Sequence, residues 1–298
     1  MTLRTLKQLL TVWLILFSTE VAVAQDRPRV VAVNHSLQYF AERLLGETAD
    51  VVFPVPPGVD PSFWRPSIAD ISMIQSADLI LLNGAGFATW VDRVSLPRSK
   101  LVNTSAAIED QFIVTESITH SHGDGGEHSH EGVASYLWLN PSLATLQAEA
   151  IAAAITARKL APADDVAARL DALRADLDAL DTMARAALQD MQSIAFIATH
   201  PRYEYFERRY GLSIASLEWE AGSIPSNDQI ENLRSLVAQT GAQILIWEAS
   251  PPTGAFDLTA DLGLQNIVFP PLARAVEGQS YIDSLKETIS SISNLDVQ

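Results

Sequence analysis

The residues of this chain best suited to chemistry are histidines, and four of its six lie between Thr119 and Gly132. The four are His120, His122, His128 and His130. Imidazole binds zinc, copper and nickel well, and two His-x-His pairs with nearby carboxylates can surround a cation. The glycines and small polar residues predict a loop, so residues 119–132 are interpreted as a metal-capturing or lid-like segment. A solubilising insert or a pH-sensitive patch is the alternative interpretation.

Three further side chains come directly after apolar runs that predict strands. They are His200 after Ile194–Thr199, Glu248 after Ile244–Trp247 and His35 after Arg29–Asn34. In open parallel sheets, ligands bind beyond the carboxyl ends of the strands. We therefore expect His200 as a metal ligand, Glu248 as a ligand or as an acceptor for a metal-bound imidazole, and His35 facing His200 across a cleft. A buried structural role for His200, and a capping or surface role for His35, are the alternatives.

Short apolar runs alternate with amphipathic stretches in both halves of the chain. In addition to the three runs above, strands are predicted at 50–55, 77–83, 101–104, 212–217 and 266–269, and helices at 37–45, 67–76, 203–210, 227–240 and 281–292. Uniformly apolar strands separated by helices are typical of a parallel sheet covered on both faces. Between the halves, Pro162–Met191 has apolar residues at spacings of three and four, which predicts one long helix.

These elements predict the α/β fold class, with two parallel-sheet α/β lobes joined by one long rigid helix. The expected divisions are a signal peptide at 1–24, an N-terminal lobe at 25–161 that includes the loop 119–132, a connecting helix at 162–192 and a C-terminal lobe at 193–298. A ligand is expected in the cleft between the lobes.

The N-terminal residues predict export. Met1–Ala24 carries Arg4 and Lys7, continues with an apolar core and ends in Ala-Val-Ala. This is the arrangement of a signal peptide, so we expect cleavage after Ala24 and a periplasmic location. The apolar run is too short to span a bilayer comfortably.

The chain is acidic and contains no cysteine. Its formal net charge is −16, and loss of Arg4, Lys7 and Glu20 with the signal peptide would bring it to −17. Such a surface repels phosphate backbones, so no nucleic-acid partner is expected. A metal ion would have to be held through nitrogen and oxygen. No nucleophile elbow, phosphate-binding glycine loop or His-Glu-x-x-His motif is found, and we expect no enzymatic activity.

Five segments of the sequence resemble the periplasmic zinc and manganese solute-binding family of ABC transporters, of the TroA-like type with a long helix. They are the histidine-rich segment and residues 55–94 (VPPGVDPSFWRPSIADISMIQSADLILLNGAGFATWVDRV), 137–155 (LWLNPSLATLQAEAIAAAI), 196–212 (FIATHPRYEYFERRYGL) and 244–250 (ILIWEAS). The resemblance implies two lobes bridged by a rigid helix. It also implies a divalent metal, zinc or another transition metal, as the cargo, and an ABC permease at the inner membrane as the partner. We expect the protein to be a monomer.

Most of the metal ligands that this resemblance implies are replaced. A histidine is implied directly after Asp60-Pro61, where the chain has Ser62, and another at Tyr136. An aspartate is implied near Pro270, and the remaining histidine is retained as His200. Because zinc needs about four donors, we expect the metal to be held by His200 with His122, His128 and His130, and with further donors from His120, Glu248 or His35.

Two other functions stay open for the same scaffold. In the first, an organic or chelated-metal ligand occupies a cleft lined by tryptophan, with Trp64, Trp90, Trp138, Trp219 and Trp247 as candidates. In the second, the protein is a periplasmic metal buffer or chaperone that does not dock on a permease.

Overall fold

The computed structural model describes residues 27–121 and 127–296, and for residues 116–121, 127–131 and 260 it describes the backbone alone. The predicted signal peptide and His122 lie outside the described residues. Within the described ranges, no helix combines the length and the apolar composition needed to cross a bilayer.

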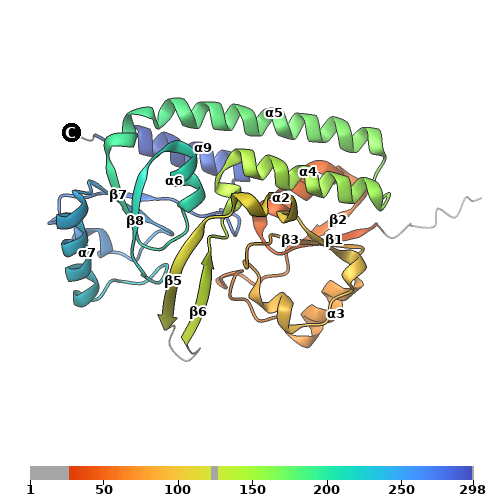
Figure 1. Ribbon diagram of the computed structural model, residues 1–298, viewed down its shortest axis with the longest axis horizontal. Coiled ribbons are helices and arrows are strands. Elements are labelled where there is room, and N and C mark those ends of the chain that lie inside the picture. Colours follow the sequence, from red (N-terminus) through yellow and green to blue (C-terminus); the bar gives the residue numbers. More distant parts are fainter. Residues whose placement is uncertain (1–26, 122–126, 297–298) are drawn as a thin grey trace, which may run out of the picture.

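Two four-stranded parallel sheets form the two lobes, as predicted (Figure 1). The first sheet has the order β2-β1-β3-β4, with β1 at Arg29–Ala32, β2 at Asp50–Val52, β3 at Leu79–Leu82 and β4 at Leu101–Asn103. The second has the order β10-β9-β7-β8, with β7 at Ala195–Ala198, β8 at Ser213–Ser216, β9 at Ile244–Trp247 and β10 at Gln265–Val268. β1, β3, β7 and β9 are almost entirely buried, which explains their uniformly apolar sequences.

Several helices begin or end where the sequence provides a cap. The helices are α2 at His35–Leu45, α3 at Ile68–Ser76, α4 at Pro141–Ala157, α5 at Ala163–Ala187, α6 at Glu204–Tyr210, α7 at Asn227–Thr240, α8 at Ala255–Ala260 and α9 at Tyr281–Ser293. Ser67 and Ser226 form capping boxes at the starts of α3 and α7. Gly241 ends α7 in the left-handed conformation that glycine adopts without strain. The sequence analysis did not predict α4 or α8.

The long helix α5 runs along one side of the molecule, across both lobes (Figure 1). Its buried residues include Val166, Leu173, Leu177 and Leu180, which lie on one face at helical spacing. This face packs against α2 and α4 of the first lobe and against α9. One hydrophobic core therefore continues from the first lobe through α5 into the second.

The histidine-rich segment differs from its prediction. Instead of a loop over 119–132, the backbone forms an antiparallel hairpin of β5, Val114–Ser121, and β6, Glu127–Val133. The β-branched residues Thr115, Ile118 and Thr119 favour extended backbone, and the register pairs Thr115 with Gly132 and His120 with His128. The hairpin projects from between the two lobes (Figure 1).

Candidate functional site

A short segment after β10 holds the second lobe against the first. The indole N–H of Trp138 donates to the Pro271 carbonyl at 2.8 Å, and the Ser36 hydroxyl donates to Leu272 at 3.1 Å. The guanidinium of Arg274 donates to the Val59 carbonyl at 2.6 Å. These hydrogen bonds hold the two lobes together along one side of the space between them.

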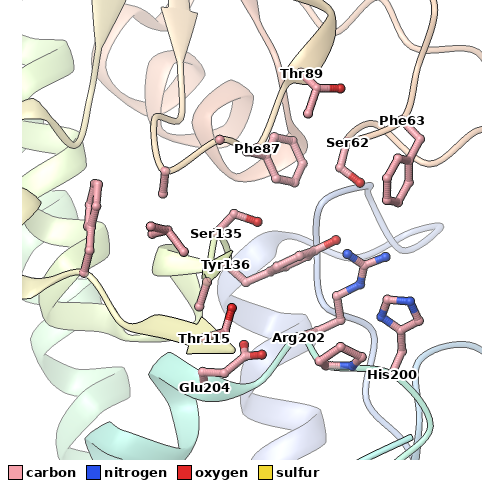
Figure 2. Close-up of a pocket in the computed structure, with 16 residues that line it drawn as sticks. Ser62, Phe63, Phe87, Thr89, Thr115, Ser135, Tyr136, His200, Arg202 and Glu204 are labelled. Carbon is pink, nitrogen blue, oxygen red and sulfur yellow. The ribbon is translucent and has the colours of Figure 1, made fainter. Parts of the chain in front are cut away.

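Two cavities lie between the lobes. One of about 450 Å³ is lined by Ser62, Phe63, Phe87 and Thr89, by the base of the hairpin and by the start of α6. The other, of about 590 Å³, is lined by Asp60, Glu248 and the segment Pro270–Val276. Phe63, Tyr136, His200 and Arg202 line both cavities. In Figure 2, Tyr136, Arg202 and His200 lie next to one another at the edge of the first cavity. This position agrees with the predicted cleft site.

His200 and Glu248 lie close together in the structure. β7 and β9 are adjacent parallel strands, so the residues that follow them lie at the same edge of the sheet. The imidazole Nδ1 of His200 is 4.0 Å from a carboxylate oxygen of Glu248. Both side chains are largely buried, and burial raises the pKa of Glu248, while the neighbouring Arg202 acts in the opposite direction. The pair therefore presents one imidazole and one carboxylate at this edge of the sheet.

Arg202 is a central residue of the site that the sequence analysis did not single out. Its Nη2 lies 2.9 Å from Asp60 Oδ2 in the first lobe, and its Nε lies 3.5 Å from Glu248 Oε1 in the second. The guanidinium carbon is 4.8 Å from the centre of the Tyr136 ring, a cation–π contact. Its place two residues after His200, at the end of a predicted strand, was the available signal.

Two of the positions where the resemblance implied histidines lie beside Arg202. Ser62 donates from its backbone and its hydroxyl to Asp60 Oδ1, at 2.8 and 2.6 Å. Tyr136 is buried, and its burial raises the pKa of the phenol well above its usual value. Pro270, near which the resemblance implied an aspartate, lines the larger cavity. Positions that are distant in the sequence therefore meet at one place, although their side chains provide few metal donors.

His35 lies apart from this group. Its ring is buried at the start of α2, its backbone N–H donates to the Ala273 carbonyl at 2.9 Å, and it lines neither cavity. Burial lowers the pKa of its imidazole, against the effect of a contact with Gln38. The structure thus does not bring His35 together with His200.

Among the hairpin residues whose side chains are described, those that line the smaller cavity lie at its base. Thr115 and Val133 line the smaller cavity, whereas His120, His128 and His130 lie further out along β5 and β6. At about 3.3 Å per residue, His120 is roughly 16 Å along the strand from Thr115. The described backbone therefore places His120 well away from the part of β5 that lines the smaller cavity.

A metal centre made of side chains that the structure describes is not found. Within the described part of the chain, no three His, Asp or Glu side chains gather closely enough to hold a metal ion. Tryptophan does not line either of these two cavities, because Trp64, Trp90, Trp138, Trp219 and Trp247 are at most 5% exposed and lie outside both linings. They are core residues, and Trp64–Trp90 and Trp219–Trp247 form ring contacts.

Comparison of the sequence with known proteins finds a family and relatives whose names refer to zinc. The family model described as "Zinc-uptake complex component A periplasmic" matches residues 30–295. The "Zinc-binding lipoprotein AdcA" of Streptococcus pneumoniae is 24% identical over 284 residues, covering 90% of this chain and 56% of that protein. The "High-affinity zinc uptake system protein ZnuA" of Bacillus subtilis is 24% identical over 280 residues, with coverages of 90% and 87%. The chain thus spans little more than half the length of the first of these relatives.

Solved structures share the fold. The metal-dependent lipoprotein YcdH of Bacillus subtilis superposes with a TM-score of 0.74 at 22% identity, covering 90% of this chain and 98% of that one. The Zn(II)-bound ZnuA-like domain of Streptococcus pneumoniae AdcA gives a TM-score of 0.74 at 19% identity, with the same coverages. At these identities the likeness concerns the fold alone.

Proposed function

The chain belongs to the periplasmic zinc-uptake complex component A family, and from this premise we propose that it is the solute-binding component of an ABC importer for a divalent metal, zinc first. The observation that carries the proposal is the approach of His200 to Glu248, 4.0 Å apart at the edge of the cavities between the lobes. Imidazole and carboxylate are both zinc donors. The permease at the inner membrane, the monomeric state and the absence of enzymatic activity are parts of the same proposal.

The proposed route has two stages. The histidines His120, His122, His128 and His130 first capture the ion on the hairpin, where donors are redundant. The ion then moves to His200 and Glu248, with hairpin imidazoles completing the coordination when the hairpin bends toward the cavity. The predicted cleavage after Ala24 and the divisions at 25–161, 162–192 and 193–298 belong to this proposal as the mature, two-lobed form of the protein.

Zinc titration by calorimetry on residues 25–298 tests the proposal. Three proteins are compared, namely the unchanged chain, His200→Ala, and a variant with the four hairpin histidines replaced by glutamine. We expect His200→Ala to weaken the tightest binding event more than the loss of any single hairpin histidine. Because the ligands must be neutral imidazoles, affinity should also be lower at about pH 5.5 than at about pH 7.5. No binding tighter than micromolar in the unchanged chain would refute the proposal.

A second cargo, a metal ion that arrives already chelated, is favoured by the size of the larger cavity. Its volume of about 590 Å³ is far larger than a bare ion requires, and Arg65 and Arg274 line it together with Arg202. Guanidinium groups pair well with the carboxylates of a small chelator. Titration with zinc citrate in parallel with zinc chloride separates the two cargoes, because only the chelated cargo predicts tighter binding of the citrate complex.

A further inference from the structure

The larger cavity has many apolar residues in its walls and a volume that suits an organic molecule. Its volume of about 590 Å³ lies within the range of about 300–1,000 Å³ that is usual for sites of small organic ligands. The apolar part of the lining comes from both lobes and includes Val59, Pro61 and Phe63 from the first lobe and residues 270–273 from the second. A hydrated ion gains little from such walls, whereas an organic ligand with an apolar body buries surface against them.

Two arginines of this lining, Arg65 and Arg274, form no ion pair within the part of the chain that the structure describes. The buried carboxylates of the lining already have a partner, because Arg202 lies 2.9 Å from Asp60 and 3.5 Å from Glu248. A guanidinium presents its N–H donors in a planar fork that matches the two oxygens of a carboxylate. The cavity therefore has positively charged donors with which an anion can pair.

Arg274 is better placed than Arg65 to recognise an anion, because it is partly buried whereas Arg65 is exposed. One N–H of Arg274 donates to the Val59 carbonyl at 2.6 Å, and the guanidinium carbon lies 5.7 Å from the centre of the Phe53 ring. These contacts orient the guanidinium from two sides and use only part of its five N–H donors. Burial lowers the pKa of Arg274, although Asp60 acts in the opposite direction. A bound carboxylate would act on the guanidinium in the same direction as Asp60 and from a shorter distance.

We propose that the larger cavity binds a small organic carboxylate with an apolar body, and that Arg274 recognises the carboxylate group. The apolar body lies against Phe63 and residues 270–273, and the exposed Arg65 attracts the anion electrostatically. This inference deepens the second form of the proposed function, on which its biological meaning rests, because a chelator of this class would carry the metal ion. Binding of the carboxylate itself requires neither a metal ion nor the histidines of the hairpin.

Isophthalate, a benzene ring with two carboxylates, is the probe for this site. In calorimetric titrations of residues 25–298, freed of metal with a chelating resin, we expect isophthalate to bind and Arg274→Gln to weaken its binding at least about tenfold. Glutamine keeps an N–H donor but has no charge, whereas Arg274→Lys keeps the charge and should retain more of the affinity. Arg234→Gln is the matched control, because it removes the same charge from an exposed position on α7 and should leave the binding unchanged. No binding of isophthalate at concentrations up to about 1 mM, or equal affinities of Arg274→Gln and the unchanged chain, would overturn the proposal.

Thermal unfolding covers the case in which Arg274→Gln is poorly stable, since its hydrogen bond to Val59 joins the two lobes. Isophthalate should raise the melting temperature of the unchanged chain and of Arg234→Gln more than that of Arg274→Gln, because a ligand stabilises the folded state that binds it. An increase of the same size in all three proteins would show that Arg274 does not recognise the carboxylate.

Dipicolinate separates this inference from the importer function. It has two carboxylates at the same positions as isophthalate, but its ring nitrogen allows it to chelate zinc. Binding of isophthalate without any binding of zinc chloride or zinc dipicolinate would support the carboxylate site and refute the importer function for zinc. Binding of zinc chloride that depends on His200, without binding of isophthalate, would do the reverse.

Discussion

The hydroxyl of Tyr205 donates a hydrogen bond to the Ala134 carbonyl at 3.0 Å, so a side chain of the second lobe holds the base of the hairpin. The same hydroxyl accepts from the Ile113 N–H at 3.2 Å. Ile113 and Ala134 lie directly outside β5 and β6 and are joined by their own backbone hydrogen bond at 2.9 Å. Both strands of the hairpin are therefore fixed to α6, next to the smaller cavity.

Tyr205→Phe should loosen this attachment. The hydroxyl is fully buried, and its removal leaves the Ala134 carbonyl and the Ile113 N–H without that partner. We expect a loss of about 1–3 kcal/mol in the free energy of unfolding, measured by urea denaturation. Tyr39→Phe is the control, because Tyr39 is only half-buried and accepts a hydrogen bond from Arg43. Equal losses for the two variants would contradict a special role of Tyr205.

Gly132→Ala should disrupt the hairpin itself. A Cβ atom at Gly132 would lie 1.8 Å from the carbonyl oxygen of Thr115, its partner across the two strands. Backbone must move to relieve this clash, so we expect faster hydrogen exchange of the amides in β5 and β6. Gly58→Ala is the control, since its φ of +79° makes alanine strained but no atom lies within 4 Å. That variant should lose about 1 kcal/mol of stability while the exchange of the hairpin stays unchanged.

The two lobes with their parallel sheets, and the connecting helix, were predictable because buried strands and buried helix faces have recognisable apolar patterns in the sequence. Strands such as Ile244–Trp247 are covered on both faces and read as unbroken apolar runs. The meeting of His200 and Glu248 followed from the rule that parallel strands end at one edge. These predictions needed only local pattern and one rule of topology.

The hairpin and Arg202 were missed because neither depends on local pattern. A polar, glycine-containing stretch is typical of a loop, and the pairing of β5 with β6 overrode that tendency. The role of Arg202 depends on Asp60, which is far away in the sequence and comes into contact only when the lobes assemble. The tryptophans were proposed as cleft residues for a related reason. Their positions near strand ends do not show whether the rings face the core or the cleft.

Asp181 should be one of the main determinants of stability at the junction of α5 and α6. Its buried carboxylate accepts from Arg209 Nη2 at 2.6 Å, Arg185 Nε at 3.1 Å and the Tyr210 hydroxyl at 3.2 Å. Burial acts to raise the pKa of Asp181, but the two arginines outweigh it and the pKa is lowered. Asp181→Asn should cost about 3 kcal/mol at pH 7 in urea denaturation, because it leaves Arg209 without its charge partner.

The pH dependence of this effect has a definite sign. A carboxylate whose pKa is lower in the folded state stabilises the protein above its unfolded pKa of about 3.9, and this stabilisation is lost as the pH falls through the folded value. The difference between Asp181→Asn and the unchanged chain should therefore shrink below about pH 4. Asp171→Asn, at a side chain 75% exposed, should cost less than about 0.5 kcal/mol at pH 7. A cost for Asp181→Asn that is the same at both pH values would contradict the ion-pair explanation.

Glu218 should make stability change in the opposite direction with pH. Partial burial raises the pKa of this carboxyl group to about 7, with Arg202 lowering it and Glu204 raising it further. The folded state therefore holds a proton that the unfolded state releases near its ordinary pKa of about 4.3. The resulting stabilisation is complete below that value and is lost as the pH rises through about 7.

Glu218→Gln keeps the shape of the neutral acid and cannot ionise. We expect the variant to unfold at the same urea concentration as the unchanged chain near pH 4, and at a higher concentration at pH 8. Because the side chain is about half exposed, water screens the effect, and the gain should not exceed about 1 kcal/mol. Glu220→Gln, which follows the same strand, is the matched control for the substitution of a glutamate by glutamine at this end of the sheet. A Glu218→Gln profile parallel to that of the unchanged chain from pH 4 to pH 8 would show that this carboxyl group titrates alike in both states.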